Sequence, residues 1–227
     1  MPTPVQLITI AAISALGGAV NSVAGGGMLL VFPALVGLGV PPIVANATGT
    51  VALWPGSMGS LWGYRHAMRG AGRWALHLAI PSLVGGLLGA LLLLSTPSER
   101  FSTLVPWLVL GATLLFVLQR PVSDWLLRRS RAARAMTGDA NAKATGGDIV
   151  AQNSIPLPAP PWPFLVLQLA IAIYGGYFGA GLGIMLIAVL GLFSDLKLNK
   201  LNAIKLLLAF VVNLFAAMFL SFSGKIE

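Results

Sequence analysis

The sequence predicts an all-α membrane protein, a polytopic helical bundle built from two inverted repeats that each open with a glycine-broken helical hairpin. Three observations support this prediction. The 227 residues are 57% hydrophobic and only 9% charged, apolar stretches long enough to cross a bilayer recur along the chain, and glycines interrupt two of these stretches. A soluble domain carries roughly 25% charged residues to cover its surface. The composition therefore excludes an ordinary water-soluble domain of this size.

The first apolar stretch runs from about residue 5 to residue 38 without a charged side chain, and it is longer than one crossing needs. It is interrupted between Asn21 and Gly27, where three consecutive glycines lower the helix propensity and leave backbone groups open. We therefore expect two half-helices that are joined at this break.

The rest of the chain alternates between apolar spans and polar connections. A second broken stretch covers about 162–193 and contains the glycine-rich segment 175–183. Unbroken crossings are expected where apolar residues are bounded by Pro, Gly or charge, at about 43–63, 74–94, 101–118 and 201–222.

Residues 120–161 separate the two apolar parts. This segment is basic and ends in a proline-rich run, so it predicts a solvated cytoplasmic linker that contains a short helix at about 122–136. The chain then divides into a first transmembrane repeat at 1–119, the linker at 120–161, and a second transmembrane repeat at 162–227.

An ungapped shift of 156 residues places the two glycine breaks in register, with Gly25 on Gly181 and Gly27 on Gly183. Six of the 24 positions from 24 to 47 are then identical. Duplicated halves with broken helices at matching positions are typical of secondary transporters, whose substrates bind near the middle of the membrane where the halves meet. The shift therefore predicts both a duplication and the place of a binding site.

The basic residues predict which ends of the spans face the cytoplasm. If each broken stretch folds back as a hairpin, twelve of the fourteen Lys and Arg lie on the inner side, whereas a single crossing by each stretch leaves ten. Because basic residues gather on the cytoplasmic side, the hairpins are preferred, and they give the two halves opposite orientations. The loops near Arg69, Arg129 and Lys197 are then cytoplasmic.

The glycine breaks carry the predicted binding chemistry. The N-terminus of a half-helix presents backbone N–H groups and a positive dipole end to an anion, and glycine lets the backbone approach it closely. Close helix packing is the alternative explanation, because small residues are common where membrane helices meet. The candidate substrate contacts in the breaks are Gly25, Gly26, Gly27, Gly179, Gly181 and Gly183.

Polar side chains near the breaks complete the candidate site. Asn21, Asn46 and Thr48 lie within or beside the first break, and Asn202 takes the place of Asn46 in the second half. Because polar groups are costly in lipid, these side chains should face protein, either as substrate ligands or in interhelical hydrogen bonds. Lys205 is the one basic side chain inside a predicted span, where it either snorkels to the interface or neutralises a bound anion.

Other classes of function lack the residues they need. The chain has no cysteine and two histidines, so neither a disulfide framework nor the usual zinc shell is expected. The basic residues lie at the ends of apolar runs and not on an aromatic-studded polar face, which argues against nucleic acid. No nucleophile with a base and no acidic metal site is evident, so we expect no enzyme, metal or cofactor. The expected partners are the lipid bilayer and a small anion, and the oligomeric state stays open.

The segments 17–27 and 41–48, with Pro33 between them, resemble the TauE/SafE family of sulfite and organosulfonate exporters. The resemblance implies a duplicated unit in the bacterial inner membrane that exports small anions such as sulfite, sulfoacetate or other organosulfonates. The family usually continues for two helices beyond Glu227, so we expect a C-terminally truncated second repeat. A non-transporting assembly subunit, or an inactive fragment of a transporter, is the alternative. The second half departs from the first by having Leu182 where the first has Gly26.

Overall fold

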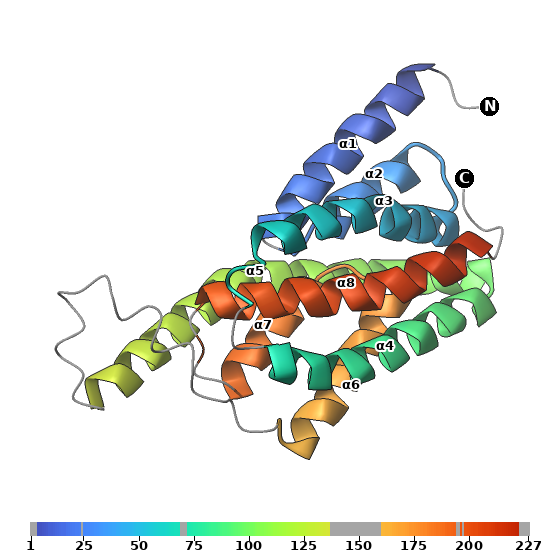
Figure 1. Cartoon of the computed structure of the whole chain (residues 1–227). Coiled ribbons are helices and arrows are strands. Elements are labelled where there is room, and N and C mark those ends of the chain that lie inside the picture. Colours follow the sequence, from blue (N-terminus) through green and yellow to red (C-terminus); the bar gives the residue numbers. More distant parts are fainter. Residues whose placement is uncertain are drawn as a thin grey trace.

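The computed structural model describes residues 4–23, 25–68, 72–136, 160–193, 196 and 198–222. Eight α-helices and no strand occur in this part of the chain, so the predicted all-helical class is confirmed there. The helices, which Figure 1 labels, are α1 (Pro4–Val23), α2 (Met28–Gly37), α3 (Pro42–Gly63), α4 (Gly72–Ser95), α5 (Ser98–Met136), α6 (Trp162–Tyr177), α7 (Leu182–Phe193) and α8 (Leu198–Phe222).

Both long apolar stretches are interrupted at their glycines. One break separates α1 from α2 and the other separates α6 from α7. Gly25 in the first break and Gly181 in the second each have φ at +79°, and Gly179 has φ at +75°. This left-handed conformation costs glycine little and other residues much, which explains why the chain leaves the helix at these points.

The first part of the predicted linker belongs to a longer helix, α5. Residues 122–136 do not form a separate short helix, because α5 runs without interruption for 39 residues and passes through Pro106 and Pro121. At 1.5 Å per residue it is about 58 Å long, roughly twice the hydrocarbon thickness of a bilayer. Leucine, alanine and arginine dominate 125–135, and their strong helix propensity continues the helix beyond the apolar span.

Helix α4 is packed against the second part of the chain through its glycines. A methyl group added at Gly89 would meet the backbone of α6 at Ile173, Gly176 and Tyr177, and one added at Gly86 would lie 2.8 Å from the carbonyl oxygen of Val212 in α8. Small residues permit this close approach of helix backbones. The glycines of α4 therefore join the first and second parts of the chain.

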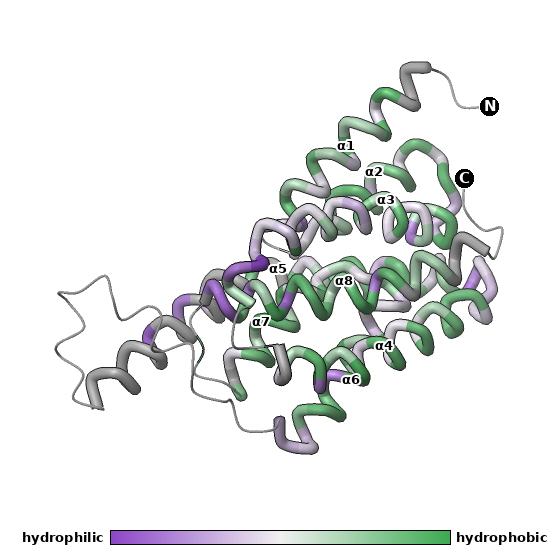
Figure 2. Tube along the Cα trace, in the orientation of Figure 1, coloured by the Kyte–Doolittle hydropathy of each residue, from purple (hydrophilic) through white to green (hydrophobic). Residues whose placement is uncertain are grey.

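Apolar side chains cover much of the outer surface. Leu76 and Ile80 of α4 are each 66% exposed, and Trp62, Trp107 and Trp162 are more than 70% exposed. Figure 2 shows hydrophobic residues along α4, α6 and α8. Within the described residues, Trp74–Ser95 and Asn199–Met218 are long and apolar enough to cross a membrane. A surface of this kind suits lipid, since soluble proteins rarely expose large apolar patches.

Several predicted features lie outside the described residues. They include Arg69, Lys197, the linker residues 137–159 and the C-terminal residues 223–227. The cytoplasmic placement of the basic loops stays a prediction.

Replacement of Gly89 by Ala should destabilise the bundle, because the added methyl group collides with three backbone positions of α6. We expect a loss of about 1–3 kcal/mol in unfolding free energy, which is typical of overpacking. The matched control is Gly111→Ala in α5, where an added methyl group meets open space and better helix propensity should hold or raise stability. Thermal unfolding in detergent measures both. Equal midpoints for the two variants would contradict the packing described for α4.

Candidate functional site

The two glycine breaks touch each other. A Cβ atom added at Gly25 would lie 2.8 Å from the Cα atom of Gly183, and one added at Gly183 would lie 2.7 Å from the Cα atom of Gly25. Segments 158 residues apart in the sequence thus meet backbone to backbone. The same contact means that an anion cannot lie between these two Cα atoms in this conformation.

Three further interactions surround this contact. The rings of Phe32 and Phe178 meet edge to face with centroids 5.3 Å apart. The side-chain amide of Asn46 donates a hydrogen bond of 2.9 Å to the carbonyl oxygen of Tyr177, and the hydroxyl of Tyr174 donates one of 2.8 Å to the carbonyl of Ala180. Because Tyr177 ends α6, Asn46 satisfies a carbonyl that has no partner within its own helix.

Some backbone donors in the first turns of α2 and α7 are occupied. The N–H groups of Leu29 and Leu30 donate to the carbonyls of Gly26 and Gly27 at 3.0 and 3.1 Å. In the second break, the N–H groups of Ile184 and Met185 both donate to the carbonyl of Gly181. The N–H groups of these four residues are therefore turned into the breaks, and fewer backbone donors face outward than the sequence led us to expect.

Packing explains part of the glycine pattern in the first break. A Cβ atom on Gly27 would collide with the carbonyl oxygen of Gly17 and would lie 2.6 Å from the Cβ atom of Asn21. Asn21 also accepts, through its own carbonyl, a hydrogen bond of 3.0 Å from the N–H of Gly25. Gly26 is buried as well. Gly27 thus has the packing role that the sequence left as an alternative.

Among the described residues, helices α3 and α8 carry most of the buried polar atoms that lack a hydrogen-bond partner. They are Oδ1 of Asn46, Oγ1 of Thr48, Nε1 of Trp54, Oδ1 of Asn202 and Nζ of Lys205, with Oε1 of Gln168 on α6. Asn46 and Lys205 are each 1% exposed. Because an unpaired buried polar group is costly, these atoms are candidates for ligand contact. The predicted site residues on α3 and α8 thus have unmet hydrogen-bonding capacity.

The stacked rings of Trp54 and Phe210 show where α3 and α8 meet. Their centroids are 5.5 Å apart and their planes are inclined by 22°. The two helices that hold the unpartnered atoms therefore pack directly on each other, and Figure 1 shows α8 running between α3 and α4.

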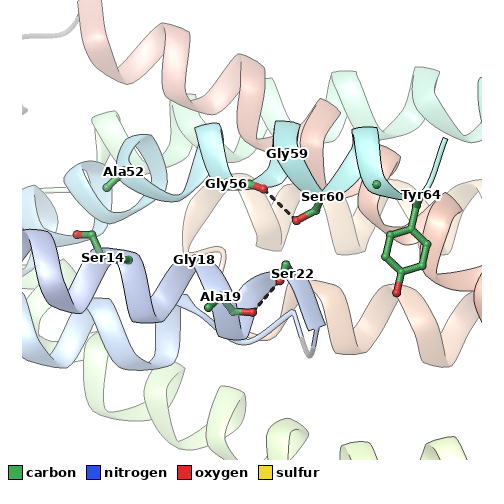
Figure 3. A pocket seen from close by; sticks show the side chains of 11 residues that line it. Ser14, Gly18, Ala19, Ser22, Ala52, Gly56, Gly59, Ser60 and Tyr64 are labelled. Atoms are coloured by element: carbon green, nitrogen blue, oxygen red, sulfur yellow. Dashed lines mark hydrogen bonds between the residues drawn. The ribbon is translucent and has the colours of Figure 1, made fainter.

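A groove of about 660 Å³ lies elsewhere, between α1 and α3. Small side chains line it, and Figure 3 shows that two of its serines bond to their own helices: Ser22 donates to the carbonyl of Ala19 at 2.7 Å and Ser60 to that of Gly56 at 2.9 Å. No charged side chain lines the groove and none of the predicted site residues does. The groove is therefore distinct from the contact between the breaks.

Two exposed positions of α1 have equivalents on α6 that α4 covers. At a shift of 156 residues, Ile8 of α1 is 70% exposed whereas Phe164 of α6 is fully buried, and Leu16 is 65% exposed whereas Ala172 is fully buried. These exposed positions of α1 are not among the residues that line the groove.

The sequence did not indicate the contact between the rings of Phe32 and Phe178 or the hydrogen bond from Asn46 to the carbonyl oxygen of Tyr177. Phe32 and Phe178 gave no signal, because each is one of many aromatic residues in an apolar stretch. The role of Tyr177 could not be found, since its backbone oxygen and not its side chain meets Asn46. A tyrosine-rich segment beside the second break was visible at 174–178, but its partner was not.

Comparison with known proteins points to one family. The profile of the family described as Sulfite exporter TauE/SafE matches residues 10–227, which confirms the resemblance seen in the sequence. The chain is 28% identical over 109 residues to the probable membrane transporter protein ORF9 of a Sinorhizobium species, over 48% of this chain and 42% of that protein. It is 30% identical over 125 residues to the probable membrane transporter protein YfcA of Escherichia coli K12, over 55% of this chain and 46% of that protein.

These matches therefore span somewhat less than half the length of each curated relative. No solved structure matches the chain.

Replacement of Gly183 by Ala should push the two breaks apart, since its methyl group would be 2.7 Å from the Cα atom of Gly25. We expect unfolding in a titration with SDS to occur at a lower detergent fraction, with a loss of about 1–3 kcal/mol. Gly37→Ala in α2 is the control, because an added methyl group there meets nothing. If Gly183→Ala unfolds like wild type while Gly37→Ala does too, the breaks do not touch as described.

Proposed function

Because this chain belongs to the sulfite exporter TauE/SafE family, we propose that it moves a small anion across a bacterial inner membrane. The observation that carries the proposal is the contact between the two helix breaks at Gly25 and Gly183. Irregular backbone at membrane depth is tolerated only where protein or a water-filled cavity shelters it, and transporters use such breaks to bind substrates. The relatives named as probable membrane transporter proteins support the same function.

We propose that the halves are inverted repeats, at 1–119 and 162–227, joined by the linker at 120–161. Gly25 and Gly181, which are 156 residues apart, have the same φ of +79°. Trp54 and Phe210 are also 156 residues apart, and their rings stack. Only positions on a two-fold axis contact their own equivalents, so this pair supports an axis that passes between α3 and α8.

The proposed substrate site lies beside the contact of the breaks, between α3 and α8. Asn46, Thr48, Asn202 and Lys205 contribute side chains, because each holds a buried polar atom without a hydrogen-bond partner. The glycine backbones of 25–27 and 179–183 join the site when the breaks separate. The conformation described here is then a closed one, and transport requires the contact between the breaks to open.

Sulfite or a short organosulfonate is the proposed cargo, and export is the proposed direction. The family description supports both. An oxyanion suits a site that offers several hydrogen-bond donors, since binding must be weak enough to permit release.

Gly26→Leu should reduce sulfite flux in proteoliposomes to that of empty vesicles, because Gly26 is buried in the first break and a leucine there would block its movement. Gly37→Leu, which adds a side chain where an added Cβ meets open space, should transport normally. Both variants should remain in the membrane. Normal flux in Gly26→Leu, and in a double variant with Asn46 and Asn202 replaced by Ala, would show that the proposed site is wrong.

The topology has its own test. The chain lacks cysteine, so single cysteines at Arg69, Arg129 and Asp195 report position without background. We expect a membrane-impermeant maleimide to label each of them from the cytoplasmic side only. Ready labelling of the cysteine at Asp195 from the periplasm would contradict the inverted arrangement.

A further inference from the structure

Lys205 is placed unusually for a lysine in an apolar helix. Its side chain is 1% exposed, and its Nζ atom has no hydrogen-bond partner within the described residues. The residue lies in the eighth position of α8, which begins at Leu198. The structure therefore does not place this amine at the protein surface, where a snorkelling lysine would be.

Helix α8, which carries Lys205, packs against α7, the helix that follows the second glycine break. The neighbour of Lys205, Ile204, belongs to the same buried cluster as Leu182 and Leu186 of α7, and α7 and α8 are in contact. Gly183, in the first turn of α7, is the residue that touches Gly25. Asn202 precedes Lys205 by three positions and thus lies on the same helix face.

Some of the other donors expected in the site are already used. The side-chain amide of Asn46 donates to the carbonyl of Tyr177, and first-turn N–H groups of α2 and α7 donate within the breaks. The unpartnered donors on α3 and α8 in the described structure are the hydroxyl of Thr48, the indole Nε1 of Trp54 and the amine of Lys205, and of these only Lys205 can carry a charge. Recognition of an anion therefore has a charged donor in Lys205, which the uncharged donors around it do not provide.

The charge of this region is not balanced by carboxylates in the described part of the chain. The acidic side chains there, Glu99 and Asp124, are both exposed and both lie on α5. A single buried ammonium without a counterion is costly in a membrane. A ligand with one negative charge neutralises the ammonium and removes this cost. A ligand with two negative charges would leave one of its own charges buried and uncompensated.

Resting on the proposed function, we infer that Lys205 makes the site selective for anions that carry one negative charge. Sulfonates and hydrogen sulfite belong to this class, and sulfate, with two charges, is disfavoured. Lys205 thereby acts as a specificity-determining residue, which neither the family profile nor the relatives assign.

Binding is measured by thermal unfolding of the purified chain in detergent, with methanesulfonate or sulfate added at equal ionic strength. We expect methanesulfonate to raise the midpoint in a saturable way, and sulfate to do so at least about tenfold more weakly, because its second negative charge would be buried without a partner. In Lys205→Met the response to methanesulfonate should weaken by a similar factor. The midpoint without ligand should rise, because a buried unpaired charge has been removed.

Lys200→Met is the matched control, since Lys200 lies on the same helix and is only partly buried; it should respond like wild type. Lys205→Gln is a second variant that keeps a polar side chain without the charge, and it should also lose the response. An unchanged methanesulfonate response in both Lys205 variants, or equal stabilisation of wild type by sulfate, overturns the inference.

Flux in proteoliposomes separates this inference from the proposed function. Selective, Lys205-dependent binding without flux supports the role of Lys205 and contradicts transport by this chain. Flux that is equal for methanesulfonate and sulfate and unchanged in Lys205→Met supports transport and contradicts the role of Lys205.

Discussion

The arrangement of this protein depends on the close approach of two interrupted helices. Gly25 and Gly183 meet without side chains between them, and this contact brings the two breaks together from distant parts of the sequence. An interrupted helix in a bilayer must shelter its open backbone groups from lipid, because water is absent there. Each break covers part of the backbone of the other. The hydrogen bond from the side-chain amide of Asn46 satisfies a further backbone group, the carbonyl oxygen of Tyr177.

Helices α3 and α8 contain buried polar atoms that have no hydrogen-bond partner among the described residues. A core that serves only for packing would not contain them. A core evolved only for stability would pair or remove the amine of Lys205 and the amide oxygens of Asn46 and Asn202, which have no hydrogen-bond partner. Proteins accept such costs at functional sites. In the function proposed above, the glycine contact and the unpaired groups have complementary roles: one holds the halves together, and the other provides binding chemistry when they move.

Much of this could be predicted from the sequence, because helix breaks and apolar spans have strong local signals. The glycines of both breaks were recognised from their low helix propensity, and the spans from their length. The continuous course of α5 through Pro121 was not predicted, since proline usually marks a helix boundary. The direct contact of Gly25 with Gly183 could not be predicted either, because the sequence identifies segments that converge without giving their separation. Nor could it reveal that first-turn N–H groups are occupied, which depends on the exact geometry of each break.

The measurement that tests the account most directly is a reversible cross-link between the breaks. Cysteines replace Phe32 and Phe178, whose rings are 5.3 Å apart, in a chain that has no other cysteine. A short bifunctional methanethiosulfonate should join them within one chain, stop anion flux in proteoliposomes, and release it again when a reductant cleaves the link. Failure of the cross-link to form, or full flux while the two breaks are joined, would contradict the claim that transport requires them to separate.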